Sequence, residues 1–225
     1  SLGRLYEKGD GVEQSFEEAA RLYRLAADTG DVDALHNLAL LYQKGNGVEQ
    51  SFEEAARLFR LAADAGDADA QNNLGDLYEA GNGVEQSFEE AARLFRLAAD
   101  NGKAAAQHNL GLLYERGKGV EQSYEEAARL YRLAADSGDP YAQTELGNLY
   151  KEGLGVEKDL ARAKLLLRQA ERAKVSDETK LSDRAASTLV SIKQTCAACG
   201  AKGNDMKVCV RCKGPRYCGR TCQRA

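Results

Sequence analysis

Apolar and polar residues alternate with a helical period through most of this 225-residue chain. Between residues 34 and 44, apolar side chains recur every three or four positions, which places them on one stripe of a helix. The stripe consists of Ala34, Leu38, Leu41 and Tyr42. Gly45 and Gly47 follow it, and glycine is the usual residue where a helix ends in a left-handed turn. The pattern predicts a helix from about residue 34 to residue 44.

A second amphipathic segment begins at Ser51. A serine followed three residues later by a glutamate, here Glu54, is typical of a capping box at the start of a helix. The apolar stripe of this segment consists of Phe52, Ala55, Ala56, Phe59, Ala62 and Ala63. We expect Glu53 and Arg57 to form an outward i,i+4 ion pair, and Gly66 to end the helix.

The two predicted helices form a unit that recurs every 36 residues. GVEQSFEEAARL begins at Gly11, Gly47 and Gly83, GVEQSYEEAARL begins at Gly119, and a diverged copy, GVEKDLARAKLL, begins at Gly155. The capping pair recurs as Ser15/Glu18, Ser87/Glu90 and Ser123/Glu126. A helix pair with one apolar face cannot bury that face alone, so we expect successive units to stack into a solenoid with a continuous core.

One position inside the first helix of each unit takes a small residue, namely Ala39, Gly75, Gly111 or Gly147. Glycine inside a helix costs up to about 1 kcal/mol relative to alanine. We interpret these residues as packing positions, at which another backbone approaches too closely for a side chain.

The repeated pattern AxxxLGxLYxxGxGVxxSxEEAxxLYxxAAxxG resembles the Sel-one-like repeat, a relative of the tetratricopeptide repeat. The resemblance covers residues 1 to about 172 and implies an all-α, right-handed α-α superhelical solenoid, with five repeats in residues 1–173. Ser1 aligns with Asn37, so the first repeat lacks the opening turns of its first helix. We therefore expect the array to be truncated at this end, and the chain's one methionine, Met206, indicates that Ser1 is not a translation start.

The repeat pattern breaks after Ala173, and residues 174–195 are predicted to be a capping helix and linker. A helical stripe remains visible there, with Ser176 or Asp177 as the N-cap. It consists of Leu181, Ala185, Thr188, Leu189 and Ile192. We expect a helix over residues 177–193 that covers the last repeat.

All six cysteines lie in the last thirty residues, at Cys196, Cys199, Cys209, Cys212, Cys218 and Cys222. Two C-x2-C pairs place thiolates on tight turns, which is typical of structural zinc sites with tetrahedral sulfur coordination. A disulfide framework is the alternative, but C-x2-C pairs beside a cysteine-free remainder favour a reducing compartment, either the cytoplasm or the nucleus. The sequence therefore predicts zinc as the cofactor, and zinc would stabilise a segment that has almost no apolar core.

The tail at residues 196–225 resembles a MYND-type zinc finger, because of the Arg-Cys-Lys run at 211–213, the Tyr-Cys run at 217–218 and Gln223. That family binds two zinc ions in a cross-braced arrangement. The resemblance implies that the first zinc is bound by Cys196, Cys199, Cys218 and Cys222. It implies Cys209 and Cys212 as two ligands of a second zinc, whose histidine and cysteine would lie beyond Ala225, so the finger is expected to be partial.

A zinc ribbon is a simpler arrangement of the same tail. It would join the two C-x2-C pairs in one site made of Cys196, Cys199, Cys209 and Cys212. Cys218 and Cys222 would then be free. The match at residues 217–223 favours the cross-braced assignment.

The net charge of −4 is unevenly distributed, because the tail at 196–225 carries seven basic residues and one acidic residue. A basic patch can bind nucleic acid. However, Tyr217 is the tail's one aromatic residue. Proteins that bind single-stranded nucleic acid use several aromatic residues to stack on the bases. We therefore do not expect nucleic acid as a partner. No apolar run approaches the ~18 residues that span a bilayer, so membrane binding is not expected either.

The sequence contains no recognisable catalytic constellation. Its two histidines, His36 and His108, occupy the same repeat position, which Asn72 and Thr144 fill in other units. A position with such varied residues is typical of a solvated helix face. Zinc with four cysteine ligands also has no open coordination position, so we predict that the chain is not an enzyme.

Stacked repeats create a long curved surface of the kind that solenoids use to bind extended partners. First helices usually line the concave side, and asparagine can both donate to and accept from a peptide backbone. The predicted partner-binding residues are Asn37, Asn73, Asp76, Asn109, Arg116 and Asn148, with Leu40, Lys44, Ala80, Leu112, Glu145 and Glu152 beside them.

These features predict an interaction scaffold with other proteins or peptides as partners. The MYND resemblance implies that the finger docks proline-containing peptides. Two alternatives are the targeting fragment of a larger MYND-containing methyltransferase and a zinc protein that binds nucleic acid through its basic tail.

Overall fold

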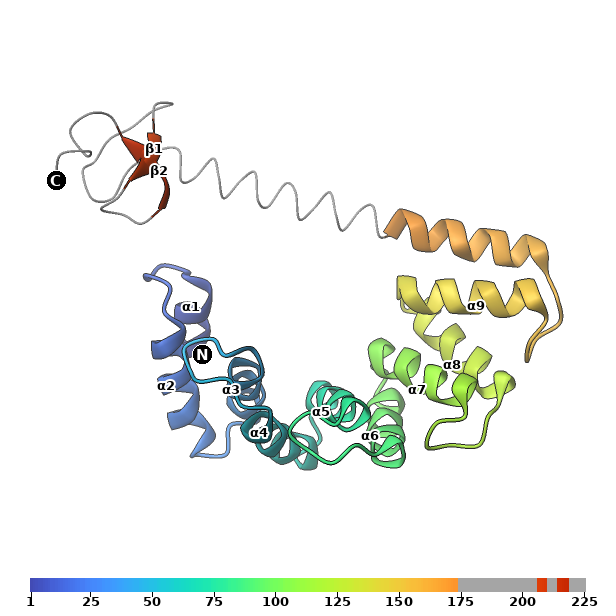
Figure 1. Ribbon diagram of the computed structural model, residues 1–225, viewed down its shortest axis with the longest axis horizontal. Helices are drawn as coiled ribbons and strands as arrows, with labels where there is room; N and C mark the ends of the chain where they lie inside the picture. Colours follow the sequence, from blue (N-terminus) through green and yellow to red (C-terminus); the bar gives the residue numbers. More distant parts are fainter. Residues whose placement is uncertain (174–205, 210–213, 219–225) are drawn as a thin grey trace. The chain divides into compact units, whose positions relative to one another are not determined.

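The computed structural model of the chain describes residues 1–173, 206–209 and 214–218. Helices fill the first of these ranges in consecutive antiparallel pairs (Figure 1). The labelled helices are α1 (Leu2–Lys8), α2 (Phe16–Ala27), α3 (Val32–Lys44), α4 (Phe52–Asp64), α5 (Ala68–Ala80), α6 (Phe88–Asp100), α7 (Ala104–Arg116), α8 (Tyr124–Asp136) and α9 (Pro140–Glu152). A further helix covers residues 160–173. The predicted helix at 34–44 begins two residues earlier, because the Asp31 side chain caps α3.

Residues 1–170 form one compact unit, in which each helix packs against the helix before it and the helix after it. The apolar stripes predicted from the sequence form its core. Ala34, Leu38, Ala55, Phe59 and Ala62 are each at most 3% exposed. The core continues from repeat to repeat as overlapping clusters of buried alanine, leucine and aromatic side chains. The fold is therefore the all-α solenoid that the repeat pattern predicted.

The serine caps form, but the predicted capping box is only half present. The Glu54 backbone N–H donates to Ser51 Oγ at 3.2 Å, while the Ser51 N–H donates to the Tyr42 carbonyl instead of the Glu54 side chain. Glu54 accepts a hydrogen bond from Arg57 at 2.9 Å. The predicted Glu53–Arg57 pair is therefore wrong, because Glu53 accepts from the Ser51 hydroxyl and Arg57 bonds the glutamate three residues before it.

The small residue inside each first helix contacts an aromatic ring in the middle of the array, and not another backbone as we expected. A Cβ atom on Gly75 would lie 2.6 Å from the ring of Phe95, and one on Gly111 would lie 2.5 Å from the ring of Tyr131. These rings belong to the second helix of the same repeat. Ala39 occupies the same position and is fully buried, so the second repeat accommodates a methyl group there.

The close backbone approach occurs at another glycine, just before each second helix. A Cβ atom on Gly47, Gly83, Gly119 or Gly155 would overlap backbone atoms at the start of the preceding repeat's second helix. Each of these glycines also has a positive φ, between 64° and 69°. Both constraints exclude a side chain, so glycine at this position allows neighbouring repeats to approach each other.

In the tail, β1 (Met206–Cys209) and β2 (Gly214–Cys218) pair as antiparallel strands. Cys209 is opposite Gly214 and Cys218 is opposite Met206, so the two cysteines lie at opposite ends of the ladder. The predicted capping helix at 177–193 lies outside the described residues. In the described part of the chain, no helix has the length and apolar character needed to cross a membrane.

Candidate interaction surface

The odd-numbered helices α1, α3, α5, α7 and α9 follow one another along the inner side of the arc formed by residues 1–170 (Figure 1). The positions of these helices that point away from the core therefore form one surface. We call it the inner surface, because it lies on the inner side of the arc. All six predicted partner-binding residues lie on these helices. Asp76 and Asn109 come together, whereas the other four do not contact each other.

Asp76 and Asn109 form a polar cluster with Asn72 across the junction between the third and fourth repeats. Asn109 Nδ2 donates to Asp76 Oδ1 at 3.0 Å and to Asn72 Oδ1 at 3.2 Å. Asn72 Nδ2 donates to Asp76 Oδ2 at 3.3 Å. Burial, with a smaller contribution from the charge of Glu79, raises the pKa of Asp76 to about 6. The cluster therefore contains a carboxylate whose charge is unfavourable in the folded protein.

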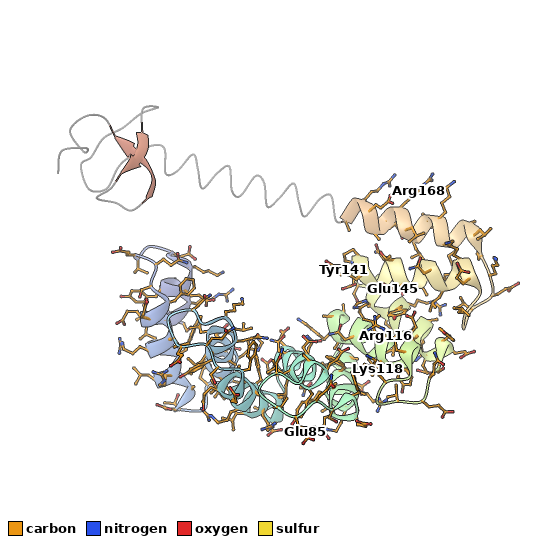
Figure 2. All side chains as sticks on the ribbon, in the orientation of Figure 1. Glu85, Arg116, Lys118, Tyr141, Glu145 and Arg168 are labelled. Atoms are coloured by element: carbon orange, nitrogen blue, oxygen red, sulfur yellow. The ribbon has the colours of Figure 1, made fainter. Side chains whose placement is uncertain are left out.

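The other predicted residues differ in how far they are already engaged. Asn37 donates to the Asp33 carbonyl at 2.7 Å, and Asn148 donates to Glu145 Oε2 at 3.3 Å. Asn73 is half-buried and Arg116 is exposed. Figure 2 shows Arg116 at the end of α7. Asn73 and Arg116 are therefore the members of the set best placed to contact a partner.

The histidine position is not the solvated helix face that the sequence suggested. The His36 side chain is 15% exposed, and its Nδ1 lies 3.2 Å from Asp67 Oδ1 at the start of α5. The Asn72 side chain at the same repeat position is buried. His36 contacts Asp67 and Asn72 contacts Asn109, so residues at this position lie against the next repeat.

A pocket of about 400 Å³ opens at the N-terminal end of the inner surface. It is formed by the first helices of three successive repeats and by the cap of α5. Arg4, Glu7, Lys8, Asp33, His36, Asn37, Asp67 and Asp69 line it. Most of these side chains are charged, so the pocket suits polar groups of a partner.

A ladder of arginine–tyrosine hydrogen bonds joins successive repeats, and it was not predicted from the sequence. Arg60 Nη2 on α4 donates to the Tyr78 hydroxyl on α5 at 2.7 Å, and Arg96 does the same for Tyr114 at 2.8 Å. The corresponding pairs at the two ends are Arg24–Tyr42 and Arg132–Tyr150. The constant spacing of 18 residues between arginine and tyrosine was a signal in the sequence.

Two of the six predicted zinc ligands, Cys209 and Cys218, lie in described strands, and the other four lie outside the described residues. The described residues contain no group of three or more His, Cys, Asp or Glu side chains that could hold a metal ion. By backbone register, Cys209 and Cys218 are separated along the ladder by about 10 Å, from three residue steps of 3.2–3.4 Å. Two sulfur ligands of one zinc ion lie within about 4 Å of each other, given a Zn–S bond of about 2.3 Å.

Comparison with known families supports the repeat boundaries seen in the structure. The Sel1 repeat model matches residues 1–31, 32–67, 68–103, 104–139 and 140–174, and the MYND finger model matches residues 196–225. The repeat matches cover more than half of the chain. The chain therefore belongs to the Sel1 repeat family.

Solved structures agree with this assignment. A protective antigen of uropathogenic Escherichia coli strains with an SLR fold is 36% identical, with a TM-score of 0.74 over 76% of this chain. This chain spans 37% of that antigen. A Sel1 repeat protein from Oxalobacter formigenes is 34% identical, with a TM-score of 0.73, and the match covers 76% of this chain and 68% of that protein. No curated protein matches the chain.

Both modules are protein-interaction modules, so in general outline the chain is an interaction adaptor. The Sel1 repeat fold is typically a non-enzymatic scaffold. The MYND finger is a zinc-binding domain, which implies zinc as the metal of the tail.

Proposed function

We propose that this chain is an adaptor that binds two proteins at once. The inner surface of the solenoid binds an extended segment of one partner. The zinc-bound finger binds a second partner through a short proline-containing peptide. Partner identity is thus set by two separate surfaces on one chain.

The observation that carries the proposal is the contrast between the core and the inner surface. Core and cap positions are nearly identical from repeat to repeat, as the recurring GVEQS motif and the buried alanines show. The outward positions of the first helices differ between repeats. One of them takes Lys44, Ala80, Arg116 and Glu152 in successive repeats, and all four side chains are exposed. A surface that varies on a constant frame can recognise an extended partner with a specific sequence.

The finger requires zinc, and its six thiols match the preference of this ion for sulfur ligands. We assign Cys196, Cys199, Cys218 and Cys222 to the first zinc, and Cys209 and Cys212 to the second. The strand register supports separate ions for Cys209 and Cys218, because their backbones lie at opposite ends of the ladder. Bound zinc would supply the folding free energy of this tail.

Affinity capture with the full chain as bait tests the proposal. One variant carries Asn73→Ala and Arg116→Ala on the inner surface, and a second carries Cys199→Ser in the finger. A matched control carries Arg57→Ala and Arg93→Ala, on the exposed faces of α4 and α6.

We expect each of the first two variants to lose one set of partners and keep the other, while the control keeps both. Capture that is unchanged in the inner-surface variant would contradict the solenoid half of the proposal. Capture that is unchanged in Cys199→Ser would contradict the finger half.

A further inference from the structure

Three aromatic rings from three helices form a stack at the C-terminal end of the inner surface. The His108 ring on α7 lies 5.8 Å from the Tyr131 ring on α8, measured between centroids. It lies 6.1 Å from the Tyr141 ring on α9, with 39° between the ring planes. The three rings therefore run from the core to the inner surface.

Exposure rises steadily along this stack. Tyr131 is fully buried, His108 is half-buried, and Tyr141 is 60% exposed. Figure 2 shows Tyr141 at the N-terminal end of α9. The His108 ring packs against one side of Tyr141, and Tyr141 presents most of its own ring to solvent. Rigid aromatic side chains of this kind are common at the energetic centres of protein interfaces.

Two acidic groups lie near these rings, Glu145 beside Tyr141 and Glu115 beside Tyr131. Glu145 lies one turn after Tyr141 on α9, where i,i+4 side chains are neighbours (Figure 2). Burial raises the pKa of Tyr131, and so do its hydrogen bond to Glu115 and the charges of Glu115 and Glu145. Both carboxylates therefore lie near the Tyr131 hydroxyl. Arg116 is the basic group that acts on the same hydroxyl, with the opposite sign.

The fifth repeat differs from the others at both of these positions. The residue equivalent to Tyr141 is Asp33, Asp69 or Ala105 in the other repeats. The residue equivalent to Glu145 is Asn37, Asn73 or Asn109. Two departures from the repeat, four residues apart on one helix face, place an aromatic ring and a carboxylate side by side at one place in the array.

We propose that Tyr141 and Glu145 bind an arginine side chain of the partner segment that lies along the inner surface. The guanidinium group stacks on the Tyr141 ring and donates hydrogen bonds to the Glu145 carboxylate. This inference rests on the proposed adaptor function and specifies the chemistry of one contact within it.

Arginine fits this site better than other side chains for two reasons. Its planar guanidinium can stack on an aromatic ring and still bond a carboxylate with two N–H groups, which an ammonium group cannot do. A proline or another apolar side chain on Tyr141 would remove water from Glu145 without offering it a hydrogen bond. Glu145 now accepts a hydrogen bond from Asn148 at 3.3 Å, so it retains capacity for further donors.

A single tryptophan provides the test, because the chain contains none. The full chain with Tyr141→Trp keeps an aromatic ring at this site and gains one specific fluorophore. The probe is a blocked five-residue glycine peptide with arginine at its centre, titrated into the protein. We expect saturable quenching by this peptide, and an affinity roughly fivefold lower for the same peptide with citrulline, which lacks the positive charge.

Glu145→Asn in the tryptophan background is the decisive variant, because asparagine is the residue that other repeats carry there and the fold tolerates it. We expect it to lower the arginine affinity roughly fivefold. Glu157→Gln, in the loop after α9, is the matched control and should leave the affinity unchanged.

Equal binding of the arginine and citrulline peptides would overturn the inference. So would a proline peptide that binds as tightly as the arginine peptide, or an affinity that is unaffected by Glu145→Asn. The solenoid half of the adaptor proposal fails by a different result, namely partner capture that is unchanged by the Asn73 and Arg116 substitutions.

Discussion

Tyr131 shows that a hydroxyl group on the buried aromatic ring of a repeat requires a hydrogen-bond acceptor. It is fully buried and donates a 2.6 Å hydrogen bond to Glu115 Oε2. Tyr23 makes the same bond to Glu7 in the first repeat. The second and third repeats carry Phe59 and Phe95 there, so those repeats need no acceptor.

We expect Glu115→Ala to lower the free energy of unfolding by about 1–3 kcal/mol, because it leaves the buried Tyr131 hydroxyl without a partner. Adding Tyr131→Phe should recover most of this loss. Urea unfolding followed by circular dichroism measures both effects. Glu79→Ala is the control, because Glu79 occupies the equivalent position beside Phe95; a loss there as large as in Glu115→Ala would contradict the explanation.

Asp76 predicts a pH dependence of stability. Its pKa is raised from 3.8 to about 6 in the folded protein, first by burial and then by the charge of Glu79. The folded state therefore holds this proton more tightly than the unfolded state does. The contribution of Asp76 to stability is most favourable below about pH 4, falls as the pH rises to 6, and stays low above that.

Asp76→Asn should remove this cost and raise the free energy of unfolding at pH 7.5 by up to about 3 kcal/mol. The asparagine carbonyl can still accept from Asn109. Unfolding curves between pH 4 and 8 should be flatter for the variant than for the natural chain. Asp64→Asn, on the outer side of α4, is the comparison, and an equal gain in that variant would show that general charge reduction is responsible.

At the scale of the elements, the glycine before each second helix determines how closely repeats stack. Gly83 has a φ of 69°, and a Cβ there would overlap the backbone at Phe52. Gly66 has a φ of 92°, but no atom lies within 4 Å of where its Cβ would be. Substitutions at these two glycines therefore distinguish the cost of a left-handed backbone from the cost of steric overlap.

Gly83→Ala should lower the free energy of unfolding by about 3 kcal/mol or more, since it adds overlap between repeats to the cost of a left-handed alanine. Gly66→Ala should lower it by about 1–2 kcal/mol, from the backbone conformation alone. Denaturant unfolding of both variants makes the comparison. Equal losses would show that the contact between repeats relaxes easily.

At the scale of the whole molecule, the solenoid and the tail draw their stability from different sources. The helices of residues 1–170 share one continuous core. The tail has few apolar residues and six cysteines, so we attribute its folding to zinc.

Removal of zinc with a chelator should therefore leave the thermal transition of the helical array unchanged, as followed by circular dichroism at 222 nm. The same treatment should abolish capture of the finger's partners. It should also release zinc, which a metal-sensitive dye quantifies. A large shift of the helical transition would contradict the independence of the two modules. Chains treated with the chelator and then given back zinc are the control.

Much of the fold followed from local pattern. The stripe of Ala55, Ala56 and Phe59 and the caps at Ser51 and its equivalents depend on residues within one or two turns, so they could be predicted from spacing. The contacts of Glu54 and Gly75 could not be predicted in this way. Several groups lie close enough to contact each of them, and the packing of the helices decides which one does.

The sequence by itself determined the repeat, its helices, its core stripe and the zinc-finger character of the tail, because periodicity and cysteine spacing are properties of the linear chain. The tertiary structure alone decided which outward residues meet. It placed Asn109 against Asp76, and it brought His108 between Tyr131 and Tyr141. The arginine–tyrosine and asparagine contacts between repeats join residues 18 to 37 positions apart, and their geometry depends on how closely the units stack. The distance between stacked repeats is set by packing at glycines such as Gly83, and no local sequence pattern reveals this packing.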